Sequence, residues 1–374
     1  MSPRHTLRLT VTPEGEPAER VAEAASLLRA GELVAFPTET VYGLGADATN
    51  ARAVMGIFIA KERPYNDPLI VHIRGVADLS GVARDIPPAA LELARRYWPG
   101  PLTLILPRAE RIPLIVTAGS DTVGVRSPSH PVAQALLAAA GVPIAAPSAN
   151  RFMRTSPTTA AHVLDDLDGR IACVLDGGPS GVGVESSVLD LTTEPPRLLR
   201  PGAVTLEELR ALLPAILGPG EGVIAPKDAG GPARAPGQME KHYAPRARLI
   251  VYDATGPAGA AAVLDAMRQA RAAGLPAGAL VPDEEAAPLE ALGAIVAPLG
   301  PASDPAAAAR ALYAGLRALD EQGCDPLLAH IYPRVGLGLA LWDRLRRAAG
   351  GRLSPPGFSP LPSSSNPHNT GGSQ

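Results

Sequence analysis

A segment rich in proline and glycine, residues 214–247, interrupts an otherwise regular alternation of short apolar runs and helical patterns. Because it shows no sustained apolar periodicity, we expect it to be a linker between two folded parts. A chain of 374 residues is long enough for two domains, each with its own core. The sequence therefore predicts a first domain over residues 13–213, a second over 248–351, and a Pro- and Ser-rich tail, 352–374, that we expect to be disordered.

Both parts have the pattern of a mixed α/β fold, in which strands and helices follow one another. In the first part, Thr122–Arg126 is a short strand that ends before a proline, and Pro131–Ala140 is helical and closed by Gly141. In the second part, strands such as Leu249–Asp253 alternate with helices, which predicts a small parallel α/β domain.

The charge balance argues against a generally basic surface. Lys and Arg number 34 against 37 Asp and Glu, for a net charge of -3, so any anion site must be a local cluster. Aromatic residues make up only 3%, so stacking platforms for single-stranded nucleic acid are scarce.

Neither a membrane nor an oxidising compartment is indicated. Residues 1–12 lack the apolar core of a signal peptide, and no apolar run approaches membrane-spanning length. Cys173 and Cys324 lie far apart and show no metal-ligand spacing, so we expect two reduced thiols and neither a disulfide framework nor a zinc site. The sequence predicts a cytoplasmic protein without a membrane partner.

The stretch from residue 31 to residue 73 concentrates the polar groups that suit a ligand. The apolar run that ends at Phe36 places the hydroxyls of Thr38 and Thr40 just after a strand. A helix follows that Asn50 can cap, and Lys61 lies on its inward face; a lysine that caps the helix dipole is the alternative interpretation. Arg63 leaves the helix beside Lys61, and two cations next to hydroxyls suit a phosphate group.

Further polar side chains stand at the ends of other predicted elements. His72 lies inside a strand, where a satisfied core histidine is the more common case. Arg126 ends a strand and suits a carboxylate or phosphate, with a surface ion pair as the alternative. No Ser-His-Asp order, metal cluster or carboxylate pair stands out. The residues predict an anion-binding, nucleotide-using enzyme that works by positioning and charge stabilisation.

A set of ordered motifs is more specific than any of these residues alone. In these motifs the chain resembles the L-threonylcarbamoyladenylate synthases, in the long form with a YrdC-type domain and a C-terminal α/β domain, over nearly its whole length. The motifs are Pro37-Thr38-Glu39-Thr40-Val41-Tyr42-Gly43-Leu44-Gly45, Lys61-x-Arg63, Pro99-Gly100-Pro101-Leu102-Thr103, Thr122-Val123-Gly124-Val125-Arg126, Ser148-x-Asn150, Glu185-Ser186-Ser187-Val188 and Arg200-Pro201-Gly202.

The resemblance implies a fold and a reaction. The fold is a twisted mixed sheet with flanking helices, followed by a smaller Rossmann-like parallel α/β domain. The reaction combines L-threonine, bicarbonate and ATP into threonylcarbamoyl-AMP and pyrophosphate, with Mg²⁺ accompanying ATP. The product serves threonylcarbamoyladenosine modification of tRNA, so tRNA or the downstream threonylcarbamoyl-transfer complex are further expected partners.

The resemblance also implies roles for single residues. Thr40, His72, Arg126 and Ser186 would contact threonine, and Lys61 and Arg63 would act near the phosphates. The nucleotide would be held by Arg63, Asp67, Thr122, Ser148, Asn150, Ser156, Arg200 and Tyr243.

Two positions depart from the family's pattern. Asp67 stands where asparagine is usual and places a carboxylate beside the expected nucleotide. Glu62 stands where glycine is common, and it would either screen the neighbouring cations or point to solvent. The end of the linker, residues 236–245, carries Lys241, His242 and Tyr243. We expect it to act as a lid that orders over the first domain when ligands bind; packing of Tyr243 at the domain interface is the alternative.

Two alternatives belong to other functional classes. A YrdC-type fold can present a concave basic surface, so a non-catalytic module that binds double-stranded RNA or tRNA is the first; the net charge argues against it. A carbamoyl-transfer partner domain, as in hydrogenase maturation proteins, is the second, but the chain lacks the acylphosphatase and zinc-finger modules found with it there.

Overall fold

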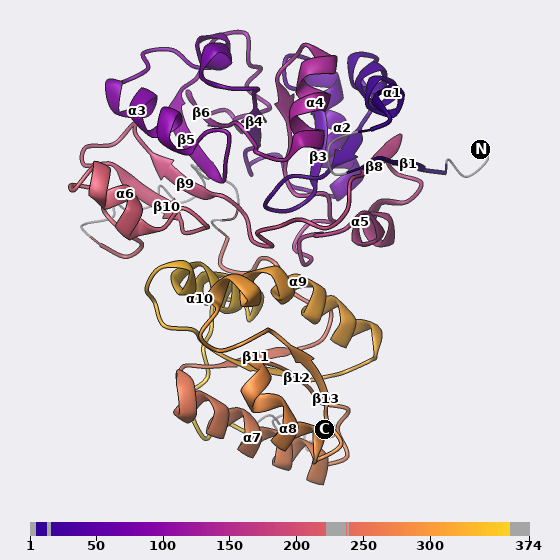
Figure 1. Cartoon of the computed structure of the whole chain (residues 1–374), viewed down its shortest axis with the longest axis vertical. Coiled ribbons are helices and arrows are strands. Elements are labelled where there is room, and N and C mark those ends of the chain that lie inside the picture. Colours follow the sequence, from indigo (N-terminus) through magenta and orange to yellow (C-terminus); the bar gives the residue numbers. More distant parts are fainter. Residues whose placement is uncertain (1–4, 13–15, 222–236, 238, 360–374) are drawn as a thin grey trace, which may run out of the picture.

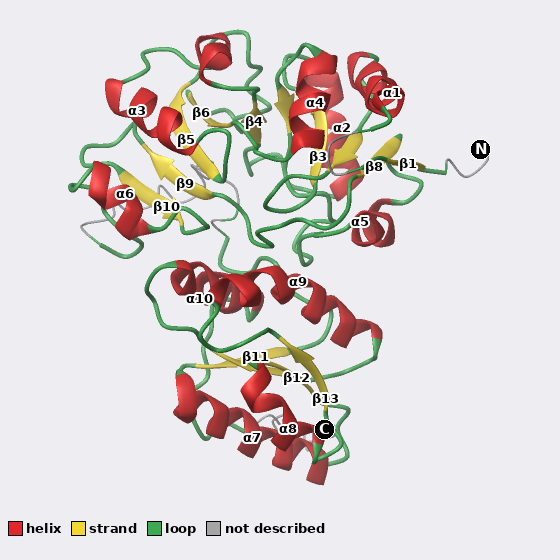
Figure 2. Ribbon diagram, viewed as in Figure 1, coloured by secondary structure: helices red, strands yellow, loops and turns green. Residues whose placement is uncertain are grey.

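The computed structural model describes residues 5–12, 16–221, 237 and 239–359. They form two bodies, one above the other in Figure 1, each built from a sheet and its helices. Figure 2 shows strands and helices mixed in both bodies, so the expected mixed α/β class is confirmed.

A ten-stranded mixed sheet runs through the first domain in the order β1-β8-β2-β3-β7-β4-β6-β5-β9-β10. Strands β4 and β6 are parallel neighbours, and their register pairs His72 with Arg126. Strands β2 and β3 form an antiparallel hairpin, so residues 37–42 are its connection. The strands are β1 (Leu7–Thr10), β2 (Val34–Phe36), β3 (Gly43–Asp47), β4 (Ile70–His72), β5 (Leu102–Pro107), β6 (Thr122–Arg126), β7 (Ile144–Ala145), β8 (Cys173–Asp176), β9 (Ser187–Asp190) and β10 (Arg197–Arg200).

Helices cover both faces of this sheet, and successive residues of β2 belong to two different cores. Val34 and Phe36 pack in the cluster that contains α1 and α4, whereas Ala35 packs in the larger cluster that contains α2, α3 and α5. The helices are α1 (Ala18–Arg29), α2 (Ala51–Lys61), α3 (Pro88–Tyr97), α4 (Pro131–Ala140), α5 (Ala160–Leu167) and α6 (Leu206–Leu212), with a 3₁₀ helix η1 (Val76–Gly81).

Helix α2 delivers Lys61 and Arg63, and both of its ends are defined by its sequence. The Asn50 side chain accepts hydrogen bonds from the backbone N–H groups of Arg52 and Ala53, so the expected cap is confirmed. At the other end, Glu62 adopts a left-handed conformation with φ 55°. Glycine adopts this conformation at the least cost, which explains why glycine suits the position.

The second domain is a four-stranded parallel sheet in the order β11-β14-β12-β13. In Figure 1, α9 and α10 cover the sheet face toward the first domain, and α7 and α8 cover the other face. Its elements are β11 (Leu249–Tyr252), α7 (Gly256–Ala272), β12 (Gly278–Val281), η2 (Asp283–Glu285), α8 (Ala286–Glu290), β13 (Ile295–Pro298), α9 (Pro305–Glu321), β14 (Leu327–His330) and α10 (Leu337–Ala348).

The two domains pack closely against each other. Val41 and Val184 of the first domain share a hydrophobic cluster with residues of α9 and α10. Gly183, at φ 85°, approaches α9 so closely that an added Cβ would lie 2.2 Å from the Ala309 carbonyl oxygen. The loop before β9 is therefore seated directly on the second domain.

The structure differs from the sequence-based boundaries at both ends. The first domain begins before residue 13, because β1 pairs with β8, and Leu9 and Val11 are buried while Thr10 between them is exposed. At the other end, Ser354 pairs with Tyr252 of β11, so residues 352–359 are part of the second domain rather than a disordered tail. The rest of the expected tail, like most of residues 222–238, lies outside the described residues.

Candidate active site

A cavity in the first domain collects most of the predicted site residues. Its free volume is about 50 Å³, room for a few water molecules and well below the roughly 300 Å³ at which ordinary ligand pockets begin. Its polar or linker-derived lining residues are Thr38, Thr40, Arg63, His72, Arg126, Ser148, Glu185, Ser186, Arg200, Gly237, His242 and Tyr243. A nucleotide therefore needs some of these segments to move.

Arg126 presents its guanidinium to the loop that follows β2. Its Nη1 donates to Thr40 Oγ1 at 2.9 Å, and its Nε donates to the Gly100 carbonyl oxygen at 3.3 Å. Its Nη2 lies 2.7 Å from Oε1 of Glu39. The fork of Arg126 thus already holds a carboxylate, which is the group that it would bind in an amino acid.

His72 contributes a neutral imidazole to the cavity wall. Burial and the neighbouring Arg126 lower the pKa of His72 to about 3, so the ring carries no charge at neutral pH. Its Nδ1 is buried and has no hydrogen-bond partner among the described residues. A ligand that enters the cavity can satisfy this nitrogen.

Arg63 reaches the cavity together with a buried carboxylate. Its Nη2 lies 2.9 Å from Oδ2 of Asp67 and donates to the Pro68 carbonyl oxygen at 2.7 Å. Burial raises the pKa of Asp67, while Arg63 acts in the opposite direction. The Asp67 side chain thus pairs with Arg63 and does not line the cavity.

Lys61 is buried behind the cavity and does not line it. Its Nζ donates to the carbonyl oxygens of Ser148, at 2.5 Å, and Asn150. Burial and the nearby Arg63 lower the pKa of Lys61. The Lys61 side chain thus fixes the segment that carries Ser148, and Ser148 itself lines the cavity.

Ser186 and Arg200 form a further part of the cavity wall. Arg200 donates to Ser186 twice, from Nε to the carbonyl oxygen at 3.0 Å and from Nη2 to Oγ at 3.1 Å. The Oγ atoms of Ser186 and Thr103 are 2.8 Å apart. Arg200 is therefore oriented by its protein neighbours.

Tyr243 closes the cavity from the linker side. It is buried and adopts a left-handed conformation with φ 62°, which is rare for a residue with a Cβ atom. Gly237 lies so close that an added Cβ there would be 2.4 Å from the Tyr243 hydroxyl oxygen. The segment is held by bonds from the N–H of His242 to the Arg347 carbonyl oxygen, and from the N–H of Ala244 to that of Met153.

The structure brings together eight of the predicted residues and places five elsewhere. Thr122 begins β6, at the opposite end of the strand from Arg126, and its hydroxyl lies 2.9 Å from that of Ser120. Ser156 contacts Glu185, and the Asn150 amide donates to its own loop. Those on the cavity are Thr40, Arg63, His72, Arg126, Ser148, Ser186, Arg200 and Tyr243; those off it are Lys61, Asp67, Thr122, Asn150 and Ser156.

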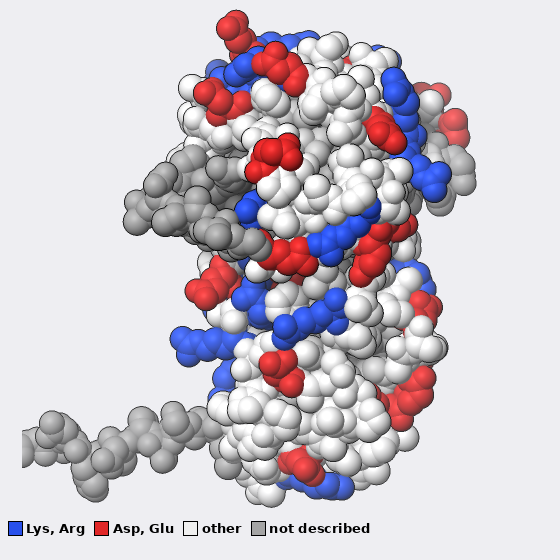
Figure 3. Space-filling model, turned by 90° about the vertical axis from the view of Figure 1, so that its left-hand side faces the viewer, with Lys and Arg blue, Asp and Glu red and all other residues white. Residues whose placement is uncertain are grey.

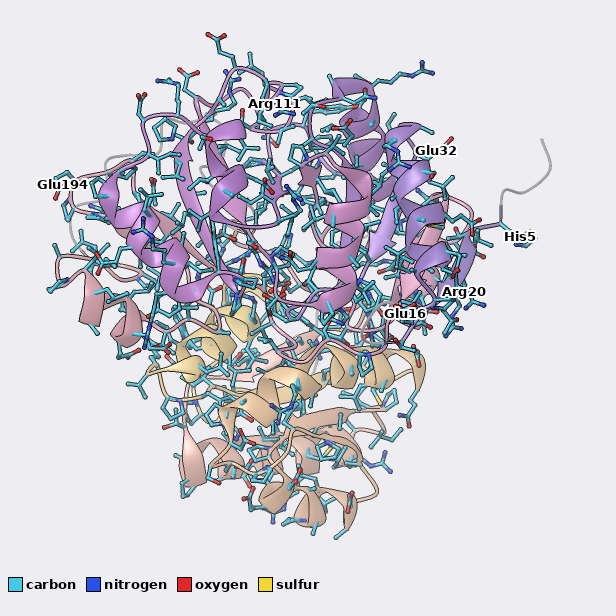
Figure 4. The ribbon with its side chains drawn as sticks, turned by 45° about the horizontal axis from the view of Figure 1, so that its top comes forward. His5, Glu16, Arg20, Glu32, Arg111 and Glu194 are labelled. Carbon is cyan, nitrogen blue, oxygen red and sulfur yellow. The ribbon has the colours of Figure 1, made fainter. Side chains whose placement is uncertain are left out.

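Sequence reasoning missed Glu39 as the partner of Arg126, and Glu185 as a wall residue with partners in the second domain. Glu39 lies inside the motif that runs from Pro37 to Gly45, so the motif itself could have indicated a role for this residue. Glu62 instead points outward and pairs with Arg151 and Arg170. Figure 4 shows six labelled side chains around the outside of the first domain, those of His5, Glu16, Arg20, Glu32, Arg111 and Glu194.

Known proteins resemble this chain across both domains. Residues 26–202 match a family model described as Telomere recombination, and residues 204–350 match one described as Threonylcarbamoyl-AMP synthase, C-terminal domain. The threonylcarbamoyl-AMP synthase of Bacillus subtilis is 43% identical over 335 residues, which cover 89% of this chain and 94% of that protein. The chain belongs to the threonylcarbamoyl-AMP synthase family.

A second relative and a solved structure agree with this assignment. The threonylcarbamoyl-AMP synthase of Pyrococcus abyssi is 43% identical over 90% of this chain and 97% of its own length. The crystal structure of P. abyssi Sua5 complexed with L-threonine has a TM-score of 0.85 and 41% identity, and covers 94% of this chain and 99% of that one. The two-domain synthase resemblance and the expected fold are thus confirmed.

The described residues show neither a cluster of metal ligands nor a membrane-spanning helix. They contain no group of three or more His, Cys, Asp or Glu side chains placed to hold a metal ion. None of the helices within them is long and apolar enough to cross a membrane.

Proposed function

We propose that this chain makes L-threonylcarbamoyl-AMP and pyrophosphate from L-threonine, bicarbonate and ATP, in the cytoplasm and for tRNA modification. The observation that carries the proposal is the cavity itself, whose lining holds Arg126, already paired with a carboxylate, together with Arg63 and Arg200. An amino acid and a polyphosphate are ligands that such a pair of anion sites can hold side by side.

The threonine half of the cavity is the part around Arg126. The guanidinium would take the substrate carboxylate in place of Glu39, with the Thr40 hydroxyl, already 2.9 Å from Arg126 Nη1, beside it. The neutral ring of His72 offers an unpaired nitrogen to the substrate's amino group or hydroxyl. Ser186 would complete the contacts.

The nucleotide half is the part around Arg63, Arg200 and Ser148. The two guanidinium groups supply positive charge and planar hydrogen-bond donors. Mg²⁺ is expected to enter as the complex with ATP, held by the phosphates, so that the protein contributes charge and position around it. Tyr243 would pack against the nucleotide.

The reaction then needs positioning more than a covalent catalyst. The threonine nitrogen combines with bicarbonate to give a carbamate and water. A carbamate oxygen attacks the α-phosphorus, the bond from that phosphorus to the bridging oxygen breaks, and pyrophosphate leaves. Preorganised arginines stabilise the charge that shifts to the leaving group, which is the usual source of catalysis in phosphoryl-type transfers.

Pyrophosphate release in the presence of ATP, threonine, bicarbonate and Mg²⁺ tests the proposal. Release that depends on both threonine and bicarbonate supports the enzyme. ATP turnover without that dependence would refute it. Tight binding of double-stranded RNA without turnover would favour the binding module instead; on the face shown in Figure 3, acidic and basic side chains are interspersed, which does not suit an extended RNA surface.

Delivery of the product is a further part of the proposal. A mixed anhydride is reactive in water, so the product must pass to a transfer enzyme or to tRNA soon after it forms. Addition of the downstream threonylcarbamoyl-transfer complex and tRNA to the same assay is expected to convert tRNA adenosine to its threonylcarbamoyl form.

A further inference from the structure

A carboxylate in the cavity wall is held by the second domain. Glu185 lines the cavity next to Ser186, yet two of its partners come from helices of the other domain. Tyr313 of α9 donates its hydroxyl to Glu185 Oε2 at 2.9 Å, and Arg344 of α10 donates its Nε to the same oxygen at 2.7 Å. The third partner, Ser156 Oγ, lies 2.5 Å from Oε1.

Arg344 is completely buried, and each of its three guanidinium nitrogens donates a hydrogen bond. Its side chain is 0% exposed. Besides Glu185, it contacts Oδ2 of Asp343 at 2.7 Å from Nη1 and the Pro201 carbonyl oxygen at 3.1 Å from Nη2. Pro201 directly follows Arg200, a predicted nucleotide-binding residue. The Arg344 guanidinium of the second domain therefore holds both the Glu185 carboxylate and the backbone next to Arg200.

The same network reaches the linker. Asp343 also accepts from Nε of Arg347 at 2.9 Å, and Nη1 of Arg347 donates to the Met239 carbonyl oxygen at 2.6 Å. The guanidinium of Arg344 lies 5.1 Å from the centre of the Tyr243 ring. Two sides of the cavity, the wall at Glu185 and the cover at Tyr243, therefore rest on α10.

Charge explains why such a support is needed in a cavity for anions. Burial alone would raise the pKa of Glu185, but Arg344, Arg200 and the Ser156 hydroxyl lower it to about 2, so the group is charged at neutral pH. A buried negative charge next to a phosphate site repels the ligand unless a cation balances it. Arg344, whose Nε lies 2.7 Å from Glu185 Oε2, is the first of the cations that supply that balance.

We propose that Arg344 is a positioning residue of the active site, which acts through Glu185 to set the nucleotide-binding wall of the first domain. The second domain then supports the active site through its contacts with Glu185. This inference rests on the proposed function for the identity of the ligand, and its test includes ATP binding alone.

The central experiment compares three variants. Arg344→Met leaves Glu185 charged and unbalanced, and we expect the KM for ATP to rise at least about tenfold and kcat/KM to fall about a hundredfold. Arg344→Met combined with Glu185→Gln removes both charges, and we expect most of the ATP affinity to return. Arg346→Met, on the same helix but stacked on Trp342 away from the cavity, is the control and should behave like the wild type.

The outcomes separate a positioning role from a merely structural one. Unchanged KM and kcat in Arg344→Met, or a double variant no better than the single one, would overturn the proposal. If Arg344→Met fails to fold, Tyr313→Phe removes only the hydroxyl that contacts Glu185, and we expect a several-fold rise in the KM for ATP; none would also overturn it. Calorimetric ATP affinities give the same ranking if the wild type binds ATP but releases no pyrophosphate, a result that would count against the proposed function alone.

Discussion

At the scale of single residues, the proposed role of Arg126 can be tested most directly. Arg126→Ala removes a charged hydrogen-bond donor from a desolvated carboxylate, and we expect threonine binding to weaken by about 1.5–3 kcal/mol, tenfold or more in Kd. ATP affinity should change much less. Calorimetry with both ligands measures the difference, and Arg95→Ala, an exposed residue of α3, is the control. Equal losses for the two ligands would remove Arg126 from the threonine site.

The role of Lys61 changes once its contacts are known. The resemblance places it near the phosphates, but its ammonium is bonded to the carbonyl oxygens of Ser148 and Asn150. Lys61→Met leaves two buried acceptors without a donor, so we expect the free energy of unfolding to fall by about 1–3 kcal/mol and the KM for ATP to rise through Ser148. Chemical denaturation and steady-state kinetics check both. A large loss of kcat with unchanged stability would instead support direct contact with phosphate.

His72 makes stability depend on pH in a defined window. The pKa of His72 is lowered from 6.5 to about 3 by burial and by Arg126. Between these two pH values the His72 side chain binds a proton in the unfolded chain but not in the folded one. Stability is therefore complete above pH 6.5 and is lost as the pH falls toward 3. Thermal melts between pH 7 and pH 4.5 should show a shallower loss in His72→Asn than in the wild type. An identical slope in both proteins would contradict the pKa; exposed His5→Asn is the control.

At the scale of elements, the capping of α2 links the sequence to the site. Asn50→Ala removes the acceptor for two backbone N–H groups, and we expect a loss of about 0.5–2 kcal/mol in the free energy of unfolding. Asn50→Asp keeps the acceptor and should lose little. Urea denaturation of the two variants measures the difference, and equal stability would show that the cap contributes nothing.

Sequence patterns predict the regular elements well and the irregular ones poorly. Thr122–Arg126 and Pro131–Ala140 have the predicted bounds, because proline and glycine mark their ends. Strand β3 is missed because its sequence, Gly-Leu-Gly-Ala-Asp, is typical of a loop, and Gly45 is needed there since an added Cβ would lie 2.8 Å from Ile144. Tertiary packing, rather than local propensity, makes it a strand.

At the scale of the whole molecule, contacts between distant parts of the chain are what the sequence could not predict. Glu185 and Arg344 are 159 positions apart, and nothing in the local pattern of either residue indicates the other. The two-domain division and the resemblance placed eight residues on one cavity. They could not say that α10 supports its wall, because that depends on how the domains pack.

The linker gives the last prediction. The sequence predicts a lid that orders when ligands bind, and in the structure Tyr243 is buried and the cavity beside it has about 50 Å³ of free volume. ATP needs more room than this, and we expect this segment to be the one that moves, because the left-handed backbone of Tyr243 carries strain of about 1–3 kcal/mol. Opening should therefore limit the rate of ATP association.

Stopped-flow mixing with a fluorescent ATP analogue tests this gating. In the wild type we expect the observed association rate to level off at high nucleotide concentration, at the rate of opening. In Tyr243→Ala the rate should keep rising linearly, with faster dissociation, since the closing ring is gone. Tyr65→Ala changes an exposed tyrosine of the same domain and should level off like the wild type. A linear rise in the wild type would mean that the segment is open to ATP and that Tyr243 only packs at the domain junction.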